Sequence, residues 1–322
     1  MRILVAGGAG YIGSRLVPEL IDMGYTVDVV DLLWFGNYLP KDVNVIQKDL
    51  FKMDETDLTS YDQVIFVAGL SNDPMAELWP SENFIQNGAC ASYLAFISKR
   101  AGVKRFIYAS SCSVYGYTVN ELFDEERPTT CNYPYGISKL QGERGCLQIQ
   151  DENFSVIAIR KGTVSGYSPR MRLDLIVNTM FKAAMMNKKL IVNNPAIWRP
   201  ILDIRDAVSG YIRAVQADQS VSGVFNISSG NYTVGQVGEI VQKKLEDLSG
   251  EKIKIEIKDV KDFRNYKILN DKAKVCLGFD PKYKVEDIVE ELYIHKDEFK
   301  DYNYPNYSNV EVLKRIKKES DK

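Results

Sequence analysis

Short apolar runs alternate with amphipathic stretches through the first half of the chain. Hydrophobic residues recur at helical spacing in residues 14–23, 84–101 and 138–150. The apolar runs that flank these stretches are residues 3–6, 26–30, 43–46, 63–67, 105–109 and 155–159. Such runs are typical of buried parallel strands. The alternation predicts an α/β fold, with a doubly wound parallel sheet and crossover helices on its faces.

A glycine-rich turn joins the first predicted strand to the first predicted helix, at a GxxGxxG spacing. Glycine at these places permits a tight turn, close approach of the backbone to a diphosphate, and packing of the helix on the strand. The start of the helix offers free N–H groups and the positive end of its dipole. The turn therefore predicts a dinucleotide site, formed by Gly7, Gly10, Tyr11, Ile12 and Gly13.

The second predicted strand ends on an acid, Asp31. It follows Gly13 at close to the spacing of about 20 residues at which a carboxylate binds the adenosine ribose hydroxyls. A carboxylate there repels a 2′-phosphate, which favours NAD over NADP. We therefore expect a Rossmann-type sheet with NAD as cofactor.

After about residue 165 the pattern loosens. Helices are predicted at residues 174–186, 206–217 and 234–248, and residues 252–257 alternate like an exposed strand. A chain of 322 residues is long for one simple domain. We expect an NAD-binding domain over residues 1–162. Residues 163–322 should form mainly a smaller C-terminal α/β substrate-binding lobe, with some segments returning to the first domain.

The composition narrows the partners and the compartment. Hydrophobic residues make up 45% of the chain and the net charge is −2, so we expect a globular protein without nucleic-acid partners. No apolar stretch reaches the roughly 18 residues of a membrane span, and no signal peptide precedes the first strand. The five cysteines form no CxxC pair, which indicates free thiols. The expected location is the cytoplasm, without a membrane partner.

The single histidine, His295, lies among charged residues near the C-terminus. A Ser-His-Asp triad or a multi-histidine metal site is therefore not expected, and we expect no metal. The YxxxK motif from Tyr135 to Lys139 occurs once in the chain, and it places both side chains on one face of a helix. A neighbouring ammonium lowers the pKa of a tyrosine, so Tyr135 could accept a proton from an alcohol while hydride leaves for NAD.

Together these motifs resemble a known family. Over nearly its whole length the chain is similar to the extended short-chain dehydrogenases/reductases of the NAD-dependent epimerase/dehydratase group, which act on nucleotide sugars. The resemblance implies Ser111 as the catalytic hydroxyl, Tyr135 as the base, and Lys139 as the residue that holds the ribose. It assigns further cofactor contacts to Asp49, Leu50, Ala68, Gly69 and Asn87. It assigns substrate contacts to Ser71, Thr163, Asn178, Arg199 and Arg264, with the diphosphate held by Arg199.

Two departures from the family narrow the expected chemistry. Sugar 4,6-dehydratases carry Asp-Glu after the catalytic hydroxyl, where this chain has Cys112 and Ser113. The cysteine of the double epimerase-reductases is likewise missing at its place. The expected activity is hydride transfer at C4 of a nucleotide-diphosphate sugar, most simply by an epimerase. A net dehydrogenase or 4-keto-reductase stays open, and a dehydratase or a non-catalytic NAD-binding regulator is less favoured.

The resemblance also bears on biology and assembly. Residues 165–174 are similar to a subgroup of surface-polysaccharide pathways. Helices of this family pair across a two-fold axis, so we expect a homodimer formed by residues 84–101 and 138–150. The apolar contacts expected there are Tyr93, Ile97, Leu140 and Leu147.

Overall fold

Seven parallel strands form the centre of the protein. The computed structural model describes residues 1–260, 264–299 and 301–320. Across the sheet the strands run in the order β3 (Asn44–Gln47), β2 (Thr26–Asp31), β1 (Arg2–Ala6), β4 (Gln63–Phe66), β5 (Arg105–Ser111), β7 (Ser155–Lys161) and β11 (Gly223–Ile227). The strand order reverses between β1 and β4, and such a switch point leaves a crevice beyond the carboxyl ends of the strands.

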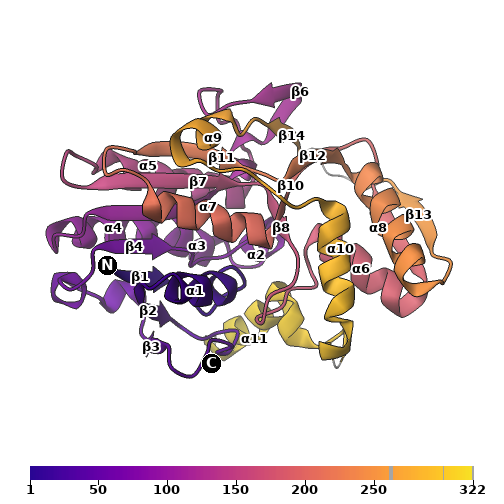
Figure 1. Ribbon diagram of the computed structural model, residues 1–322, viewed down its shortest axis with the longest axis horizontal. Helices are drawn as coiled ribbons and strands as arrows, with labels where there is room; N and C mark the ends of the chain where they lie inside the picture. Colours follow the sequence, from indigo (N-terminus) through magenta and orange to yellow (C-terminus); the bar gives the residue numbers. More distant parts are fainter. Residues whose placement is uncertain (261–263, 300, 321–322) are drawn as a thin grey trace.

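Helices cover both faces of this sheet, as expected (Figure 1). On one face, Ile3 and Val5 of β1 join a core with α1 (Gly13–Asp22) and α7 (Ile204–Gln216). On the other, Leu4 and Ala6 join a core with α4 (Cys90–Arg100). Next to α4 lies α5 (Pro134–Gln148), and α9 (Asp271–Leu277) contacts β11. The alternation of neighbouring residues between the two cores explains why these strands are apolar throughout. The predicted Rossmann-type fold is confirmed.

Two of the predicted helices differ in detail. The helix predicted over residues 84–101 is divided into α3 (Pro80–Phe84), a π-helical turn over Ile85–Ala89, and α4. The helix predicted from residue 138 begins four residues earlier, since Pro134 occupies its first turn, where its missing N–H costs nothing. Tyr135 therefore lies in the first turn of α5.

The second half of the chain builds a lobe beside the sheet, at the right of Figure 1. Its core lies among α6 (Ile176–Asn187), α8 (Val234–Ser249), α10 (Val285–Ile294) and the strand pair β9 (Lys189–Asn193) and β13 (Lys254–Lys258). A three-stranded sheet of β8 (Thr163–Ser165), β10 (Trp198–Asp203) and β12 (Gly230–Thr233) adjoins it. Segments of the second half also return to the first, because β11 completes the large sheet and α7 covers it.

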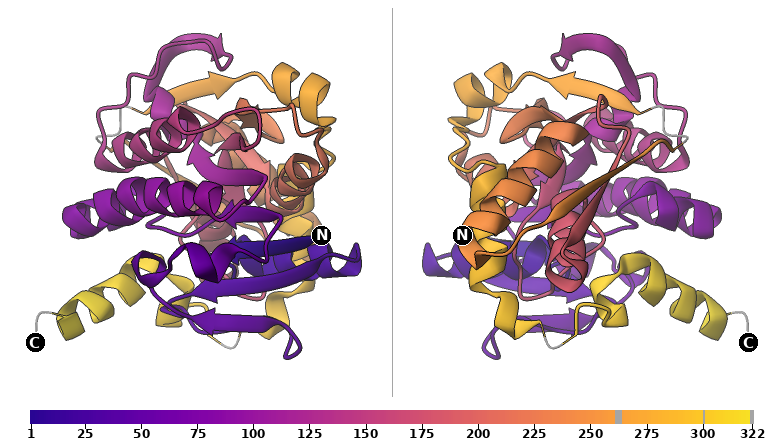
Figure 2. Two further views of the ribbon diagram at one scale, coloured as in Figure 1. Left: turned by 90° about the vertical axis from the view of Figure 1, so that its left-hand side faces the viewer. Right: turned by 90° about the vertical axis from the view of Figure 1, so that its right-hand side faces the viewer.

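Two further connections tie the halves together. β14 (Asn265–Ile268) pairs with β6 (Tyr117–Phe123), and α11 (Asn309–Ser320) packs against α2 (Asp73–Leu78). Figure 2 shows α11 in yellow, running away from the lobe beneath the first domain. Within the described residues, no helix has the length and apolar character needed to cross a membrane.

Candidate active site

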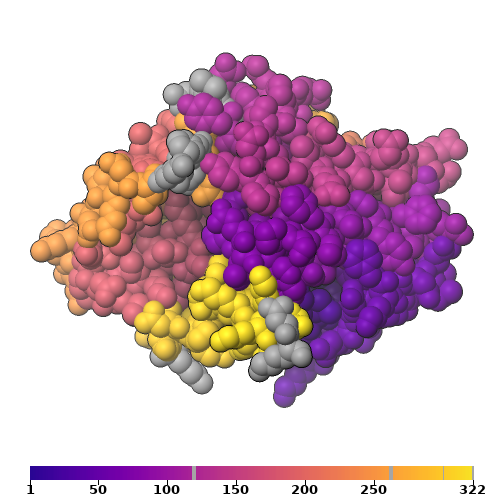
Figure 3. Space-filling model, turned by 180° about the vertical axis from the view of Figure 1, so that it is seen from behind, coloured from indigo at the N-terminus to yellow at the C-terminus, as the bar shows by residue number. Residues whose placement is uncertain are grey.

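A cleft of about 730 Å³ opens between the carboxyl edge of the large sheet and the lobe, and appears as a hollow in Figure 3. Twelve of the predicted site residues line it. They are Gly7, Gly10, Tyr11, Ile12, Gly13, Gly69, Ser71, Ser111, Tyr135, Thr163, Arg199 and Arg264. The predicted residues that do not form its wall are Asp31, Asp49, Leu50, Ala68, Asn87, Lys139 and Asn178.

The glycine-rich turn is shaped to receive a diphosphate. Gly7 has a φ of +81°, and a Cβ there would lie 2.5 Å from the Cα of Ala68. A Cβ on Gly13 would lie 2.3 Å from the carbonyl oxygen of Gly8. No side chain caps the start of α1 and its first turn holds no acid, so the positive end of the helix dipole meets no competing carboxylate within the helix. These features fit the phosphates of a dinucleotide.

Asp31 lies beside this turn, at the end of β2. Its carboxylate accepts hydrogen bonds from the backbone N–H groups of Ala9, at 3.1 Å, and Leu33, at 2.8 Å. Burial raises the pKa of Asp31, and these hydrogen bonds oppose the rise. The carboxylate is therefore held in place next to the glycine turn, as a ribose ligand requires.

Other predicted cofactor residues have structural roles in this structure. The Asp49 carboxylate caps a short helix through the N–H of Phe51, and Leu50 is buried in the core. Asn87 lies behind Gly69, fully buried, and its amide nitrogen donates to the Leu70 carbonyl at 2.9 Å. Ala68 contributes the backbone that Gly7 approaches. None of these four residues forms the wall of the cleft in this structure.

Ser111 and Tyr135 meet at the end of β5. Burial raises the pKa of Tyr135, and a hydrogen bond from Ser111 works against that rise. Lys139 is buried one turn further along α5, with its Nζ 5.1 Å from the ring centroid of Tyr108. Burial lowers the pKa of Lys139 to about 7.

The expectation that Lys139 lowers the pKa of Tyr135 needs correction. In the protein alone, the neighbours that oppose the raised pKa of Tyr135 are Ser111 and Arg172, not Lys139. The desolvation of both side chains outweighs the expected charge effect, because burial disfavours the phenolate and the ammonium alike.

A second lysine, which the sequence did not single out, lines the cleft. Lys161 ends β7 directly opposite Ser111 in the strand register. Its Nζ donates to the carbonyl oxygen of Ser110 at 2.7 Å. Burial and the charge of Lys139 hold the pKa of Lys161 well below its usual value.

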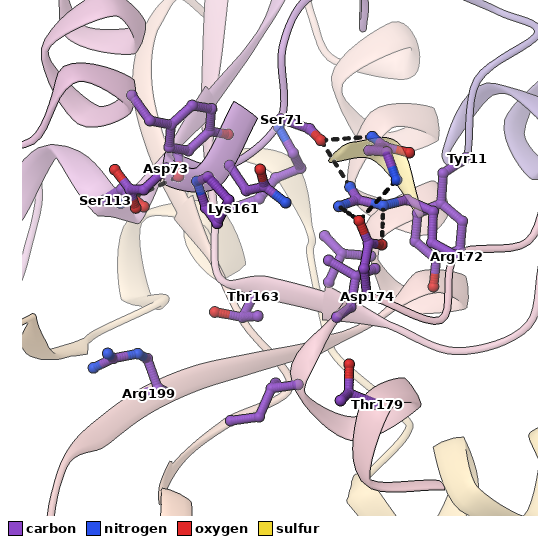
Figure 4. Close-up of a pocket in the computed structure, with 18 of the residues that line it drawn as sticks. Tyr11, Ser71, Asp73, Ser113, Lys161, Thr163, Arg172, Asp174, Thr179 and Arg199 are labelled. Carbon is purple, nitrogen blue, oxygen red and sulfur yellow. Dashed lines mark hydrogen bonds and ion pairs between the residues drawn. The ribbon is translucent and has the colours of Figure 1, made fainter. Parts of the chain in front are cut away.

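A network at the mouth of the cleft was also missed (Figure 4). Arg172 forms a two-pronged ion pair with Asp174, and its Nη1 donates to the Ser71 hydroxyl at 2.8 Å. Asn309, the first residue of α11, donates through Nδ2 to the same hydroxyl at 2.9 Å and accepts from Arg170 at 2.6 Å. The Ser71 hydroxyl is therefore held by two distant segments of the chain, around Arg172 and Asn309.

Two arginines that were predicted as substrate contacts line the cleft and touch each other. Arg199 lies across the cavity from the network around Arg172, as Figure 4 shows, and it donates to the carbonyl of Arg264. Arg264 pairs with the carboxylate of Asp73. β10 pairs with β8, so that Thr163 also lines the cleft. Arg199 and Arg264, both predicted as substrate contacts, are thus brought together.

The predicted role of Asn178 as a substrate contact needs correction. It is fully buried, and its amide serves the loop that follows β8. Its Nδ2 donates to the carbonyl of Arg172 at 2.7 Å, and its Oδ1 accepts from the N–H of Gly166 at 3.0 Å. With both ends of the amide occupied away from the cleft wall, Asn178 orients the loop and does not face the cleft.

The histidine and the cysteines lie apart from this chemistry. His295 stacks on Tyr167 with ring centroids 3.7 Å apart, outside the cleft wall. All five cysteines are free, and the Cys112 thiol points to the carbonyl of Arg160. Among the described residues no group of three or more His, Cys, Asp or Glu side chains could hold a metal ion.

The fold and the cleft define a dinucleotide-dependent enzyme with a serine at the end of β5 and a tyrosine in the first turn of α5. Residues 3–228 match the model of the NAD dependent epimerase/dehydratase family. The chain therefore belongs to this family, and NAD is its cofactor.

The chain is similar to relatives over most of its length. The chain is 25% identical to UDP-glucose 4-epimerase of Bacillus subtilis (strain 168), over 89% of this chain and 94% of the relative. It is 28% identical to UDP-glucuronic acid decarboxylase 5 of Arabidopsis thaliana, over 92% of both chains. Among solved structures, MoeE5 in complex with UDP-glucuronic acid and NAD matches with a TM-score of 0.81 and 25% identity, over 92% of this chain and 99% of MoeE5.

Proposed function

We propose that the protein interconverts nucleotide-diphosphate sugars by NAD-dependent hydride transfer at C4, acting as a 4-epimerase. One observation carries this proposal. A proton-accepting pair, Ser111 and Tyr135, lines the same cleft as the glycine turn, and so do Arg199 and Arg264. The UDP-sugars in the names of the relatives support this substrate class.

The residues of the cleft divide the chemistry among them. Ser111 holds the 4-hydroxyl of the sugar and Tyr135 takes its proton. NAD supplies the acceptor for the hydride from C4 and returns it later. Lys139 binds the cofactor ribose from behind Tyr135. After the keto sugar has turned in the cleft, Tyr135 gives the proton back, and the opposite configuration results.

The substrate diphosphate is assigned to the lobe side of the cleft. A guanidinium binds phosphate oxygens in a bidentate manner, which suits Arg199 and Arg264. Ser71 and Thr163 offer hydroxyls nearer the sheet edge, where the sugar would lie. Asp73 orients Arg264 through its ion pair.

A substitution of Arg199 tests this assignment. Loss of a charge-assisted contact costs on the order of 1.5–3 kcal/mol, so Arg199→Ala should raise KM for the nucleotide sugar about ten- to a hundredfold. Arg213→Ala, an exposed arginine on α7, is the matched control. Titration with a nucleoside diphosphate alone decides the point, because undiminished binding to Arg199→Ala would contradict the role.

A net dehydrogenase or 4-keto-reductase is the second candidate, because Ser111, Tyr135 and Lys139 serve one transfer as well as two. Dehydration is disfavoured by the residues after Ser111. Cys112 is buried, burial raises the pKa of its thiol, and Ser113 is no acid. A panel of nucleotide sugars, followed by both NADH absorbance and product stereochemistry, tests the proposal. We expect a C4 epimer without net NADH, whereas accumulating NADH would favour the dehydrogenase.

We also propose a cytoplasmic homodimer that serves surface-polysaccharide or glycan biosynthesis. The helices α4 and α5 lie side by side and leave Phe96 48% exposed. The expected contacts need correction, because Ile97 is buried in its own core, and Tyr93 and Leu147 are packed against it. Leu140 is partly buried against a different cluster, which includes Tyr115 and Tyr266. Sedimentation at micromolar concentration tests the dimer, with a species of about twice the 36.5 kDa chain mass expected.

A further inference from the structure

Arg170 is a buried cation in the wall of the cleft. It is 2% exposed, and its guanidinium carbon lies 3.9 Å from the ring centroid of Phe35. Both residues line the cleft. Burying a charged group costs free energy unless a partner of opposite charge and further hydrogen bonds compensate for the lost water. This cost makes Arg170 a candidate for a binding role.

The partner of Arg170 inside the protein is neutral. Its Nη2 donates to the amide oxygen of Asn309 at 2.6 Å, and among the described residues no carboxylate forms an ion pair with it. The nearby carboxylate of Asp174 is engaged by both prongs of Arg172. Burial and the charge of Arg172 lower the pKa of Arg170 to about 9, so the guanidinium is still a cation at neutral pH. One positive charge in the cleft wall is therefore left for a ligand.

The segment that carries Arg170 lies against the glycine-rich turn. The Ser168 hydroxyl donates to the carbonyl of Tyr11 at 2.7 Å. Phe35, on which Arg170 stacks, follows β2 and its terminal Asp31. Burial raises the pKa of Asp31, and the charge of Arg170 is one of the effects that oppose this rise. Arg170 is therefore close to the turn expected to hold the cofactor diphosphate and to the acid expected to hold the adenosine ribose.

A residue of the C-terminal helix holds Arg170 in place. Asn309 is 5% exposed and lines the cleft as the first residue of α11. Its Oδ1 accepts from Arg170, and its Nδ2 donates to the Ser71 hydroxyl at 2.9 Å. Its backbone N–H donates to Asp174 at 2.9 Å. A flipped amide would set its N–H donors against a guanidinium, which has donors alone, so the orientation of Asn309 is fixed.

We propose that Arg170 binds the diphosphate of NAD together with the glycine-rich turn, and that Asn309 is the positioning residue that directs it there. A guanidinium offers paired N–H donors to phosphate oxygens, and such charge-assisted bonds are stronger than neutral ones. The assignment gives the C-terminal helix a part in cofactor binding. It goes beyond the proposed function, because it rests on NAD as the cofactor and not on the 4-epimerase activity.

Affinity for NAD⁺ tests the role of Arg170. Dissociation constants for NAD⁺ are measured by calorimetry at pH 7.5. Arg170→Met removes the charge and should raise Kd about ten- to a hundredfold, as loss of a charge-assisted contact does. Arg170→Gln keeps an N–H donor and is the second neutral variant if the methionine variant does not fold. Arg213→Met, at an exposed arginine of α7, is the matched control. An unchanged Kd in the neutral variants would overturn the proposal.

Titration with UDP separates the two diphosphates that the cleft is expected to hold. Arg170→Met should bind UDP as tightly as the wild type does, whereas Arg199→Ala should lose affinity for UDP. Lost affinity for UDP with unchanged affinity for NAD⁺ in Arg170→Met would overturn the proposal, because the guanidinium would then serve the substrate. A wild-type protein that binds no UDP would contradict that choice of nucleotide alone, and the NAD⁺ constants would still decide the role of Arg170.

A double-mutant cycle tests whether Asn309 acts through Arg170. Asn309→Ala should raise Kd for NAD⁺ about three- to tenfold, because the guanidinium loses the acceptor that directs it. In the Arg170→Met background the same substitution should change Kd less than about twofold, since the positioned group is gone. Asn303→Ala, at an exposed asparagine of the same segment, is the control. Equal effects of Asn309→Ala in both backgrounds would overturn the positioning role, because additivity indicates a general loosening of the fold.

Discussion

The hydroxyl of Tyr11 donates a hydrogen bond of 2.7 Å to the carbonyl oxygen of Gly166. This bond joins the glycine-rich turn of the cofactor site to the loop that enters the lobe. The Ser168 hydroxyl returns a bond of 2.7 Å to the carbonyl of Tyr11. Asn178 donates to the same Gly166 oxygen. The two sides of the cleft are therefore fastened together at the point where the cofactor diphosphate is expected.

Tyr11→Phe should weaken both folding and cofactor binding. Loss of a buried hydrogen bond costs about 1 kcal/mol of unfolding free energy, and the released loop should reduce NAD affinity about three- to tenfold. Urea denaturation and NAD titration measure the two effects. Ser98→Ala removes another buried hydrogen bond, the one of 2.6 Å from the Ser98 hydroxyl to the carbonyl of Leu94 within α4. This control should lose comparable stability with unchanged NAD affinity, and an equal loss of affinity in both variants would refute the specific role of Tyr11.

Tyr135→Phe should fold normally and bind NAD, yet lose at least about a hundredfold in turnover, as removal of a general base does. Since burial raises the pKa of Tyr135, the wild-type rate should also rise with pH through the neutral range. Steady-state kinetics with an accepted nucleotide sugar checks both statements. Near-wild-type turnover of the variant would show that another group takes the proton.

Asp31→Ser should weaken NAD binding and narrow the gap to NADP, because the ribose loses its carboxylate partner and the 2′-phosphate is no longer repelled. Titration of the variant with both cofactors measures the change. Asp54→Ser removes a carboxylate that caps the short helix Glu55–Leu58 and does not line the cleft, so it should leave both affinities unchanged. Equal affinity of the wild type for NAD and NADP would contradict the assignment of Asp31.

Much of the first domain could be predicted because its strands are buried on both faces. Local sequence then suffices, as for β1 and β2. Strands such as β8 and β12 were missed because they are short and only partly buried, and their pairing is with distant segments. The π-helical turn before α4 breaks a continuous apolar pattern that favoured one helix.

The residues of the candidate site likewise fall into those that local sequence predicts and those that depend on distant segments. Glycines and the YxxxK motif are readable because backbone geometry and helix spacing are local properties. The network around Ser71 depends on α11 returning across the fold, since Arg170 and Asn309 are 139 positions apart in the sequence. Lys161 follows a strand like any solvent-facing lysine, and only the register with β5 places it beside Ser111.

The two buried lysines should leave a mark on the pH dependence of stability. The pKa of Lys139 is about 7 in the folded protein against 10.5 for the ordinary side chain. Between these values the unfolded chain binds a proton that the folded chain releases, so the free energy of unfolding should rise with pH above 7. Lys161 acts in the same direction.

Lys139→Met should therefore be more stable than the wild type at pH 7, with the difference shrinking toward pH 9. Urea denaturation at pH 7, 8 and 9 measures it, and Lys41→Met, at an exposed lysine, is the control that should follow the wild type. Parallel pH curves for wild type and Lys139→Met would contradict the desolvation of Lys139.

The fate of the C4 hydrogen tests the central claim most directly. A nucleotide sugar that the protein accepts is labelled with deuterium at C4, incubated with the enzyme, and analysed by NMR. An epimerase built on Ser111 and Tyr135 should yield the C4 epimer with the deuterium still at C4, because the same hydride returns to the opposite face. Deuterium released on free NADH, or moved to another carbon of the sugar, would contradict the account.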